Sequence, residues 1–263
     1  MIAKAFPAAQ AISTAPTVSE AVLDRLRGDI VAGAIAPQAR LAMKELTQRY
    51  GVGLSPLREA LHRLAGEGFV LFFGQRGFKV PPISLADLED LTELRLMVEA
   101  AAVKQAVVRG GDAWEAGLVA AFHTLELQIG RFGRGDEASI RRYDAAHRAF
   151  HVAMFEGVVA PRLAALHANL FDQAYRYRKL LHAGEIRPAE VLREHRRLLQ
   201  LLLTRDEAAA GAALGHHLTL TREAWRREAK KQGQVQPKEA PRRQVQAQAP
   251  ALVPAPVRLG RRK

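Results

Sequence analysis

The chain has 263 residues, 48% of them apolar, and it contains no cysteine. This length suits one large domain or two ordinary ones, and the lack of cysteine excludes disulfides, thiolate metal sites and cysteine nucleophiles. The net charge is +12, but the stretch from Arg226 to Lys263 holds eleven Lys or Arg and two Glu, a net of +9, which leaves about +3 for the rest; total charge alone is therefore weak support for a polyanionic partner.

The N-terminal stretch, 1–16, has one lysine and no sustained apolar run. It does not fit a signal peptide, and we expect a short flexible arm. No segment of the chain approaches the roughly eighteen uninterrupted apolar residues of a membrane span. We therefore expect a cytoplasmic protein with no membrane partner.

The region 17–83 predicts three helices followed by two strands. The first helix starts at a cap supplied by Thr17 or Ser19 and ends at Gly33. Two shorter helices follow in "MKELTQRYG" and "LSPLREALHRLAGEG", and "FVLFFGQRGFKV" gives two short apolar strands around a glycine-tipped turn. Three helices and a hairpin in this order predict a winged helix-turn-helix DNA-binding domain.

In such a domain the second helix of the turn lies in the major groove, and its N-terminal residues approach base edges. Arg58 lies on that helix and can reach a guanine or a phosphate. The preceding helix and the wing tip add positions that can meet the DNA backbone. The predicted DNA-binding residues are Lys44, Ser55, Arg58, Arg76 and Gly77. For one arginine alone, an ion pair with a nearby glutamate is the simpler explanation, but the ordered set favours DNA.

The segments "PLREAL", "EGFV" and "RGFKV" have the order and spacing found in the N-terminal domain of GntR-type bacterial transcription regulators, which 17–83 closely resembles. The resemblance implies a sequence-specific regulator, and we expect a homodimer on a palindromic double-stranded operator. Many members begin the recognition helix with Ser-Arg-Thr, whereas this chain has Gly53-Leu54-Ser55. The missing arginine implies a different operator half-site.

The region 84–229 predicts an all-α bundle of six helices, the first capped by Ser84. The expected helices are 85–109, 113–131, 136–156, 160–182, 188–203 and 206–229. The final stretch, 230–263, is rich in Pro, Gln, Ala and Arg and predicts a disordered basic tail. The predicted fold is thus mainly α, with a winged helix-turn-helix, then a helical bundle, then the tail.

Four histidines in this bundle could form a metal site. His147 and His151 are four residues apart on one helix and share a face, which Asp144 also shares. His195 and His217 lie on the last two helices, which the short "TRD" loop makes antiparallel neighbours. Four imidazoles from three helices would hold Zn²⁺, Ni²⁺ or a similar ion. A histidine pair on one helix is, however, more often structural or exposed than ligating.

The region 85–227 resembles the helical effector-binding (FCD) domain of the FadR-like branch of GntR regulators. Many members of that branch hold a metal ion with an aspartate, a histidine four residues later and two further histidines on the last two helices. Three of the four histidines match this pattern, and His147 occupies the usual aspartate position. The resemblance therefore implies a divalent metal; either His147 ligates as a fourth imidazole or Asp144 reaches in, and we favour His147.

Within that branch, segments such as "HRAFHVAM" and "LFDQAYRYR" are most similar to repressors of carbon-starvation-induced operons for glutarate and 2-hydroxyglutarate breakdown. The resemblance implies a small carboxylate effector. Arg95 stands among apolar residues at helical spacing, where it either faces a cavity as a carboxylate fork or pairs with Glu99 on the surface. Tyr177 and Arg178 are further candidates for effector binding.

Two other classes remain on the sequence alone. The histidines could belong to a metal-dependent enzyme, or the helical domain could merely dimerise a constitutive architectural DNA-binding protein. The chain contains no HExxH pattern and no recognisable nucleophile–base arrangement. We therefore expect a regulator that is not an enzyme.

Overall fold

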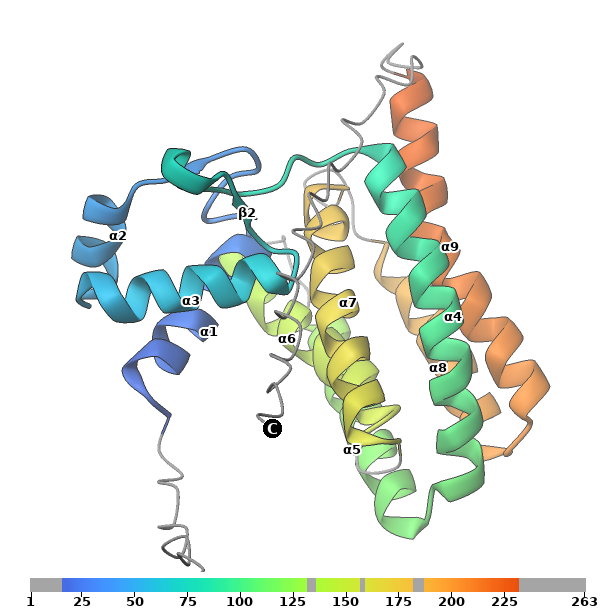
Figure 1. Cartoon of the computed structure of the whole chain (residues 1–263). Helices are drawn as coiled ribbons and strands as arrows, with labels where there is room; N and C mark the ends of the chain where they lie inside the picture. The colour runs from blue at the N-terminus through green and yellow to red at the C-terminus, as the bar shows by residue number, and fades with distance from the viewer. Residues whose placement is uncertain (1–15, 132–135, 157–158, 182–186, 232–263) are drawn as a thin grey trace, which may run out of the picture.

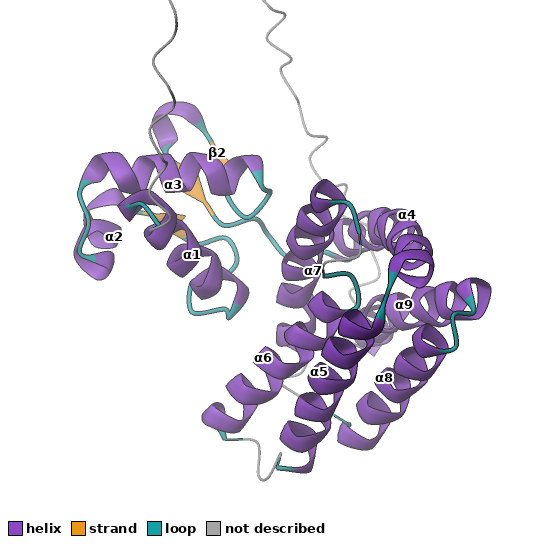
Figure 2. Ribbon diagram, turned by 90° about the horizontal axis from the view of Figure 1, so that it is seen from below, coloured by secondary structure: helices purple, strands orange, loops and turns teal. Residues whose placement is uncertain are grey.

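A computed structural model of the chain describes residues 16–131, 136–156, 159–181 and 187–231, which form a small N-terminal unit and a helical bundle (Figures 1 and 2). The N-terminal unit consists of α1 (Val18–Val31), β1 (Arg40–Leu41), α2 (Met43–Tyr50), α3 (Leu54–Gly66), β2 (Leu71–Phe72), a single 3-10 turn (Gly74–Arg76) and β3 (Phe78–Lys79). The bundle consists of α4 (Leu85–Arg109), α5 (Asp112–Gly130), α6 (Glu137–Ala153), α7 (Pro161–Leu181), α8 (Pro188–Leu203) and α9 (Glu207–Lys231). None of the helices in the described ranges is long and apolar enough to cross a membrane.

The three N-terminal helices pack around one apolar core, as predicted. The N-cap of α1 is Thr17, which forms a capping box with Glu20. Ser19, the other candidate cap, lies inside the helix. Leu26, Leu57 and Leu61 have no exposed surface. Burying such side chains stabilises the unit by about 1.5–3 kcal/mol each.

The wing is a three-stranded antiparallel sheet in the order β1-β3-β2. The expected hairpin is present as β2 and β3, but its tip is a 3-10 turn, and β1 was not predicted from the sequence. A two-residue strand is too short to show alternation. Gly77 ends the turn at φ 81°, ψ −146°, a backbone conformation that is essentially restricted to glycine.

The bundle follows the predicted helix order. In it α4 packs on α7 and α9, while α5 packs on α6 and α8. Its core includes the fully buried side chains of Leu118, Leu125 and Phe150. Helix α6 ends at Ala153, before the predicted end at 156, and α9 continues to Lys231, so the start of the predicted tail is helical. The rest of that tail and residues 1–15 of the predicted arm lie outside the described residues.

Helix α7 joins the two units. The side-chain amides of Asn169 and Gln173 both donate to the backbone oxygen of Glu67, at 3.2 and 3.0 Å. Arg176, farther along the same helix, donates to the backbone oxygen of Pro81 at 3.1 Å. The N-terminal unit is therefore attached to α7 by polar contacts at the end of α3 and beyond the wing.

Candidate metal and effector site

The structure brings together all four histidines of the predicted metal site. His147 and His151 come from α6, His195 from α8 and His217 from α9. One ring nitrogen from each lies within 4.8 Å of the others, and the Nε2 atoms of His151 and His195 are 3.2 Å apart. Tetrahedral Zn²⁺ with bonds of about 2.0–2.1 Å separates its ligand nitrogens by about 3.3 Å. One pair thus has the required spacing, and no other pair exceeds 4.8 Å, which is about 1.5 Å wider than this spacing.

The four rings are held in the neutral form that a metal ion requires. Burial, and then the nearby positive charge of Arg178, lower the pKa of His195 to about 3. Burial likewise holds the pKa values of His147, His151 and His217 well below their ordinary range, with further lowering from neighbouring charges. Because a metal competes with protons for the imidazole lone pair, a neutral cluster is ready to bind at pH 7.

Hydrogen bonds orient these rings only in part. The Nδ1 atom of His195 donates to the backbone oxygen of Val191 at 2.7 Å, which leaves its Nε2 lone pair for the cluster. The Nδ1 atoms of His151 and His217 are buried and have no hydrogen-bond partner among the described residues. Leaving such a group unpaired costs about 1–3 kcal/mol. This donor set fits a divalent ion bound by nitrogen.

Asp144 lies outside this group. Its Oδ2 atom accepts from Lys179 Nζ at 2.6 Å. His147, in contrast, is buried within the cluster, where Arg178 Nη1 lies 2.9 Å from its Nδ1 and also contacts Nε2. The geometry favours His147 over Asp144 as the ligand, and Arg178 must then turn away from the ring.

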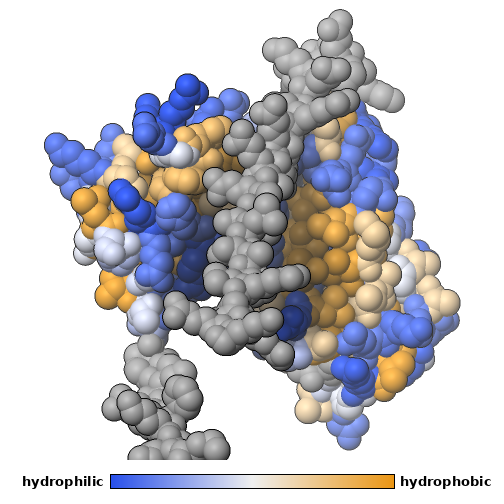
Figure 3. Space-filling model, in the orientation of Figure 1, coloured by the Kyte–Doolittle hydropathy of each residue, from blue (hydrophilic) through white to orange (hydrophobic). Residues whose placement is uncertain are grey.

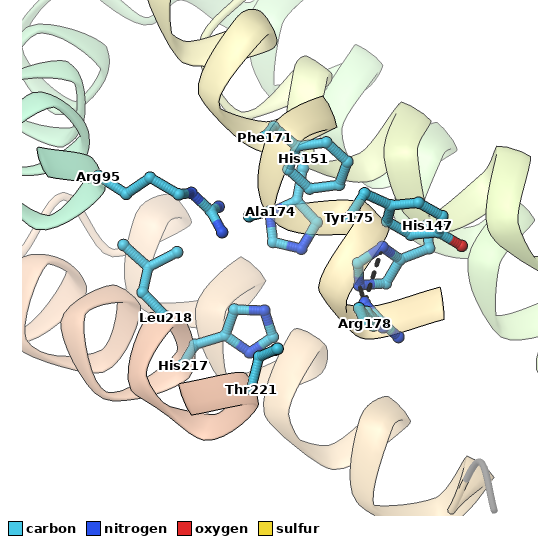
Figure 4. Close-up of a pocket in the computed structure, with 10 residues that line it drawn as sticks. All are labelled: Arg95, His147, His151, Phe171, Ala174, Tyr175, Arg178, His217, Leu218 and Thr221. Atoms are coloured by element: carbon cyan, nitrogen blue, oxygen red, sulfur yellow. Dashed lines mark hydrogen bonds between the residues drawn. The ribbon is translucent and has the colours of Figure 1, made fainter. Parts of the chain in front are cut away.

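A small cavity opens beside the histidines (Figure 4). It offers about 30 Å³ of free space, room for roughly one or two water molecules. An acid of several carbon atoms therefore needs side chains to move, and Arg178 is one that can. The cavity is lined by Arg95, His147, His151, Phe171, Ala174, Tyr175, Arg178, His217, Leu218 and Thr221.

Arg95 faces this cavity and pairs with Glu99 at the same time, so the two alternatives from the sequence are not exclusive. Its Nε atom donates to Glu99 Oε1 at 2.7 Å, and its guanidinium lies 5.6 Å from the ring centre of Phe171. Glu99 is fully buried, not on the surface. Burial raises the pKa of Glu99, but the charges of Arg95 and His167 outweigh it and leave the pKa below its ordinary value.

His167 is a buried residue that no pattern in the sequence singles out. Its Nδ1 atom lies 3.5 Å from Glu99 Oε1, across from α4. The one available signal is its phase on α7, since it lies four residues before the cavity residue Phe171. His167 thus belongs to the wall that positions Glu99 and, through it, Arg95.

The structure does not bring Tyr177 to the cavity. The Tyr177 hydroxyl contacts Asp87, and its backbone oxygen accepts from the indole of Trp225 at 3.1 Å. Residues two apart on a helix face different sides, so the preceding tyrosine, Tyr175, lines the cavity together with Arg178. Burial raises the pKa of Tyr175, which keeps its phenol protonated and able to donate a hydrogen bond.

The predicted DNA-binding side chains lie at the surface. Those of Lys44, Ser55, Arg58 and Arg76 are exposed, and Gly77 is half-buried behind the wing tip. At the start of α3, the apolar side chain of Leu54 is 59% exposed. The sequence analysis missed Arg40, because it missed β1.

Arg40 is exposed, and its guanidinium donates to the backbone oxygen of Arg76 at 3.3 Å. It therefore brings a second positive charge close to the wing tip. A short strand preceding the helix-turn-helix is the structural reason for this placement.

Comparison with known proteins identifies both units. Residues 18–80 match the model for bacterial regulatory proteins of the gntR family, and residues 90–220 match the FCD domain. The HTH-type transcriptional repressor GlaR of Escherichia coli (strain K12) is 35% identical over 198 residues, which cover 73% of this chain and 89% of that protein. The HTH-type transcriptional regulator BphR of Paraburkholderia xenovorans (strain LB400) is 36% identical over 208 residues, which cover 79% and 84% of the two chains.

Solved structures share the fold. E. coli McbR/YncC superimposes with a TM-score of 0.67 at 23% identity, over 83% of this chain and all of the other. A regulator from Rhodococcus sp. RHA1 gives a TM-score of 0.61 at 21% identity, over 83% and 99% of the two chains. The family and its members are transcription regulators and not enzymes, which removes the metalloenzyme alternative. This chain belongs to the gntR family of bacterial regulatory proteins and carries an FCD domain behind its winged helix-turn-helix.

Proposed function

We propose that the protein is a homodimeric transcriptional repressor that works in the cytoplasm and releases its operator when a small carboxylate binds at the histidine cluster. One observation carries the proposal: α7 forms a wall of the cavity that Arg95 and three of the four histidines line, and the same helix holds the DNA-binding unit. A ligand in that cavity is thus one helix away from the DNA-binding surface.

The proposed cofactor is a divalent ion held by His147, His151, His195 and His217. A bound ion would supply a positive centre for a carboxylate or hydroxyl oxygen of the effector. Four imidazoles fill the coordination positions of a tetrahedral Zn²⁺ site. An ion that also binds the acid therefore needs a fifth or sixth coordination position. Ni²⁺ meets that requirement readily, and Zn²⁺ meets it by expanding its coordination.

The charges around the cluster support a dicarboxylate. Arg95 and Arg178 approach the histidines from opposite sides of the cavity (Figure 4). Glu99 uses Nε of Arg95 and thereby aims the rest of the guanidinium at the cavity, where it can bind a carboxylate as a fork. Arg178, once turned away from His147, can meet the second carboxylate. Glutarate and 2-hydroxyglutarate are the acids that the chain's resemblance to their regulators suggests.

The route to DNA runs along α7. Phe171 and Tyr175 line the cavity on one face, while Asn169 and Gln173 hold the backbone of Glu67 on another. A shift of α7 that accommodates the acid moves these amides and the end of α3 with them. Coupling of this kind changes affinity by about 1–3 kcal/mol, roughly 5- to 150-fold.

The operator contacts would come from α3 and the wing. Arg58 can bind a guanine or a phosphate, and Ser55 can bond to a base or to the backbone. The exposed Leu54 would meet the methyl group of a thymine, which suits the absence of the usual arginine. The sugar-phosphate backbone of the operator would be contacted by Lys44, Arg76 and Gly77.

Capture of fragmented genomic DNA by the purified protein tests the proposal. We expect discrete palindromic sites, and the genes beside them should act on small carboxylic acids. A matched chain that ends at Lys231 should recover the same sites. Featureless binding that disappears with salt and in the shortened chain would mean that the basic tail is the sole DNA-binding part, and would refute the proposal.

A further inference from the structure

The wall of the cavity beside the histidines is mostly polar, unlike the outer surface of the helices around it. Apolar side chains gather over α4 and neighbouring α7 on the face seen in Figure 3. Most of the side chains that line the cavity are instead polar or charged. Because a buried polar group without a hydrogen bond is costly, the wall favours a ligand that can pair with these groups.

The two arginines of this wall can only donate hydrogen bonds. Arg95 and Arg178 suit the carboxylates of the proposed acid, because a guanidinium has five N–H donors and no acceptor. They cannot accept a hydrogen bond from a hydroxyl group of the ligand. The histidine nitrogens are assigned to the proposed ion. An acid that carries a hydroxyl group therefore needs an acceptor elsewhere in the wall.

Two side-chain hydroxyls line the cavity, those of Tyr175 and Thr221. Tyr175 is already hydrogen-bonded to Asp144, and a phenol oxygen is a weak acceptor because its lone pair is delocalised into the ring. Thr221 is half-buried, and its side chain makes no hydrogen bond within the described part of the chain. The other threonines inside the described helices each donate to a backbone oxygen three or four residues earlier; they are Thr47, Thr92, Thr124 and Thr219. The hydroxyl of Thr221 is thus available to a ligand.

The position of Thr221 on α9 brings this hydroxyl close to the histidine cluster. Thr221 follows His217 by four residues, so the two side chains share one face of the helix, one turn apart. Figure 4 shows Thr221 beside the imidazole of His217, which belongs to the cluster. The proposed function places one carboxylate of the acid at that cluster. A hydroxyl group on the carbon next to this carboxylate is therefore the part of the acid nearest to Thr221.

We propose that the cavity selects a dicarboxylic acid with a hydroxyl group next to one carboxylate, and that Thr221 recognises this hydroxyl. The inference rests on the proposed function, because it concerns the same acid at the same site. The hydrogen of Thr221 goes to the backbone oxygen of His217, as in other helical threonines, and its oxygen accepts from the acid. Thr221 is thus a specificity-determining residue of the effector site.

This contact separates acids of the same charge and chain length. Glutarate has no hydroxyl and leaves the oxygen of Thr221 unpaired, whereas 2-hydroxyglutarate fills it. A site built to hydrogen-bond a ligand hydroxyl discriminates against the analogue that lacks it. The acceptor also lies on one wall only. One enantiomer of 2-hydroxyglutarate therefore points its hydroxyl at Thr221, and the other points it away.

Calorimetric titration of the full-length, Ni²⁺-loaded protein with glutarate and with each enantiomer of 2-hydroxyglutarate tests the inference. We expect the wild type to bind one enantiomer roughly tenfold more tightly than glutarate or the other enantiomer. Thr221→Val keeps the branched shape of the side chain and removes the hydroxyl. It should weaken the preferred enantiomer roughly tenfold and leave the affinity for glutarate within about twofold.

Thr219→Val is the matched control, because it makes the same change on the same helix at a residue outside the cavity. It should keep the wild-type preferences. Thr221→Ser retains a hydroxyl and should keep most of the preference, which separates loss of the hydroxyl from loss of the fold.

Equal affinities of the wild type for the three acids, or a preference that survives in Thr221→Val, would overturn the inference and leave the proposed function intact. A preference lost in Tyr175→Phe but kept in Thr221→Val would overturn it too, and would assign the hydroxyl to Tyr175. A wild type that binds none of the three acids would refute the proposed acid response itself, and the inference with it.

Discussion

His217 offers the sharpest test of the metal site, because its neighbour His216 on the same helix is exposed and outside the cluster. The pair of variants His217→Ala and His216→Ala changes the same chemical group at adjacent positions. Only the first removes a nitrogen from the cluster. A four-ligand structural Zn²⁺ site has about 10–16 kcal/mol of binding free energy, or about 3 kcal/mol for each ligand. Loss of His217 should therefore weaken the ion's affinity by roughly 100-fold.

The same estimate predicts a thermal shift. At an ion concentration 100 times the dissociation constant, the wild type gains about 2.7 kcal/mol. A domain of this size shifts its melting temperature by about 2–4 °C per kcal/mol, which predicts a rise of about 5–10 °C. In His217→Ala the same ion concentration is close to the dissociation constant, so the gain falls to about 0.4 kcal/mol, or about 1 °C.

Calorimetric titration of chelator-treated protein and thermal unfolding with and without the ion measure both quantities. The wild type and His216→Ala should bind one ion per chain and show the full shift. Equal affinity and equal shift in His217→Ala would refute the metal site, and so would an equal loss in both variants. Melting of each variant in chelator separates loss of the ion from general instability.

Three further outcomes follow from the same contacts. The pKa of His195 is lowered to about 3 in the folded protein, against an ordinary 6.5, so as the pH falls this histidine is protonated first in the unfolded chain. The metal-free protein should therefore lose up to about 1.4 kcal/mol of stability per pH unit from this group between pH 6.5 and 3. Urea unfolding curves that coincide at pH 7 and 5 would be inconsistent with this. Glu99→Ala leaves Arg95 buried without its carboxylate and should lower the free energy of unfolding by about 3–5 kcal/mol, measured in urea. The control Glu93→Ala removes an exposed carboxylate from its pair with Arg222 and should cost less than about 1 kcal/mol. Equal losses would argue against the buried pair. Gln173→Ala should still bind operator and acid, but the coupling free energy between the two should fall by about 0.5–2 kcal/mol. Operator affinity with and without acid, measured by fluorescence anisotropy, gives this coupling. An unchanged coupling would exclude the route along α7.

Local patterns in the sequence predicted most of the helices. Each helix of the bundle has its apolar residues at helical spacing, and caps such as Ser84 mark where helices begin. The histidine pair on α6 follows from i, i+4 spacing alone. Its meeting with His195 and His217 depends on α8 and α9 lying side by side, which the short loop between them indicated.

What the sequence did not reveal depends on helix rotation and on contacts between distant segments. Tyr177 and Tyr175 differ by two positions, and only the orientation of α7 decides which one faces the cavity. The burial of Glu99 depends on α7 covering α4, where His167 approaches it. The side-chain amide of Gln173 donates to the backbone oxygen of Glu67, 106 residues earlier in the chain. Local sequence patterns do not predict contacts at this separation.

Operator affinity of the metal-loaded protein, measured with and without acids, tests the central claim most directly. Once genomic capture has supplied an operator, glutarate and 2-hydroxyglutarate should raise its dissociation constant by roughly 5- to 150-fold. Pentanoate, which has the same chain length but one carboxylate, should have a smaller effect, and Arg95→Ala should remove most of the response. An affinity that no acid changes, with the ion bound and the operator site-specific, would contradict the account and identify a constitutive DNA-binding protein.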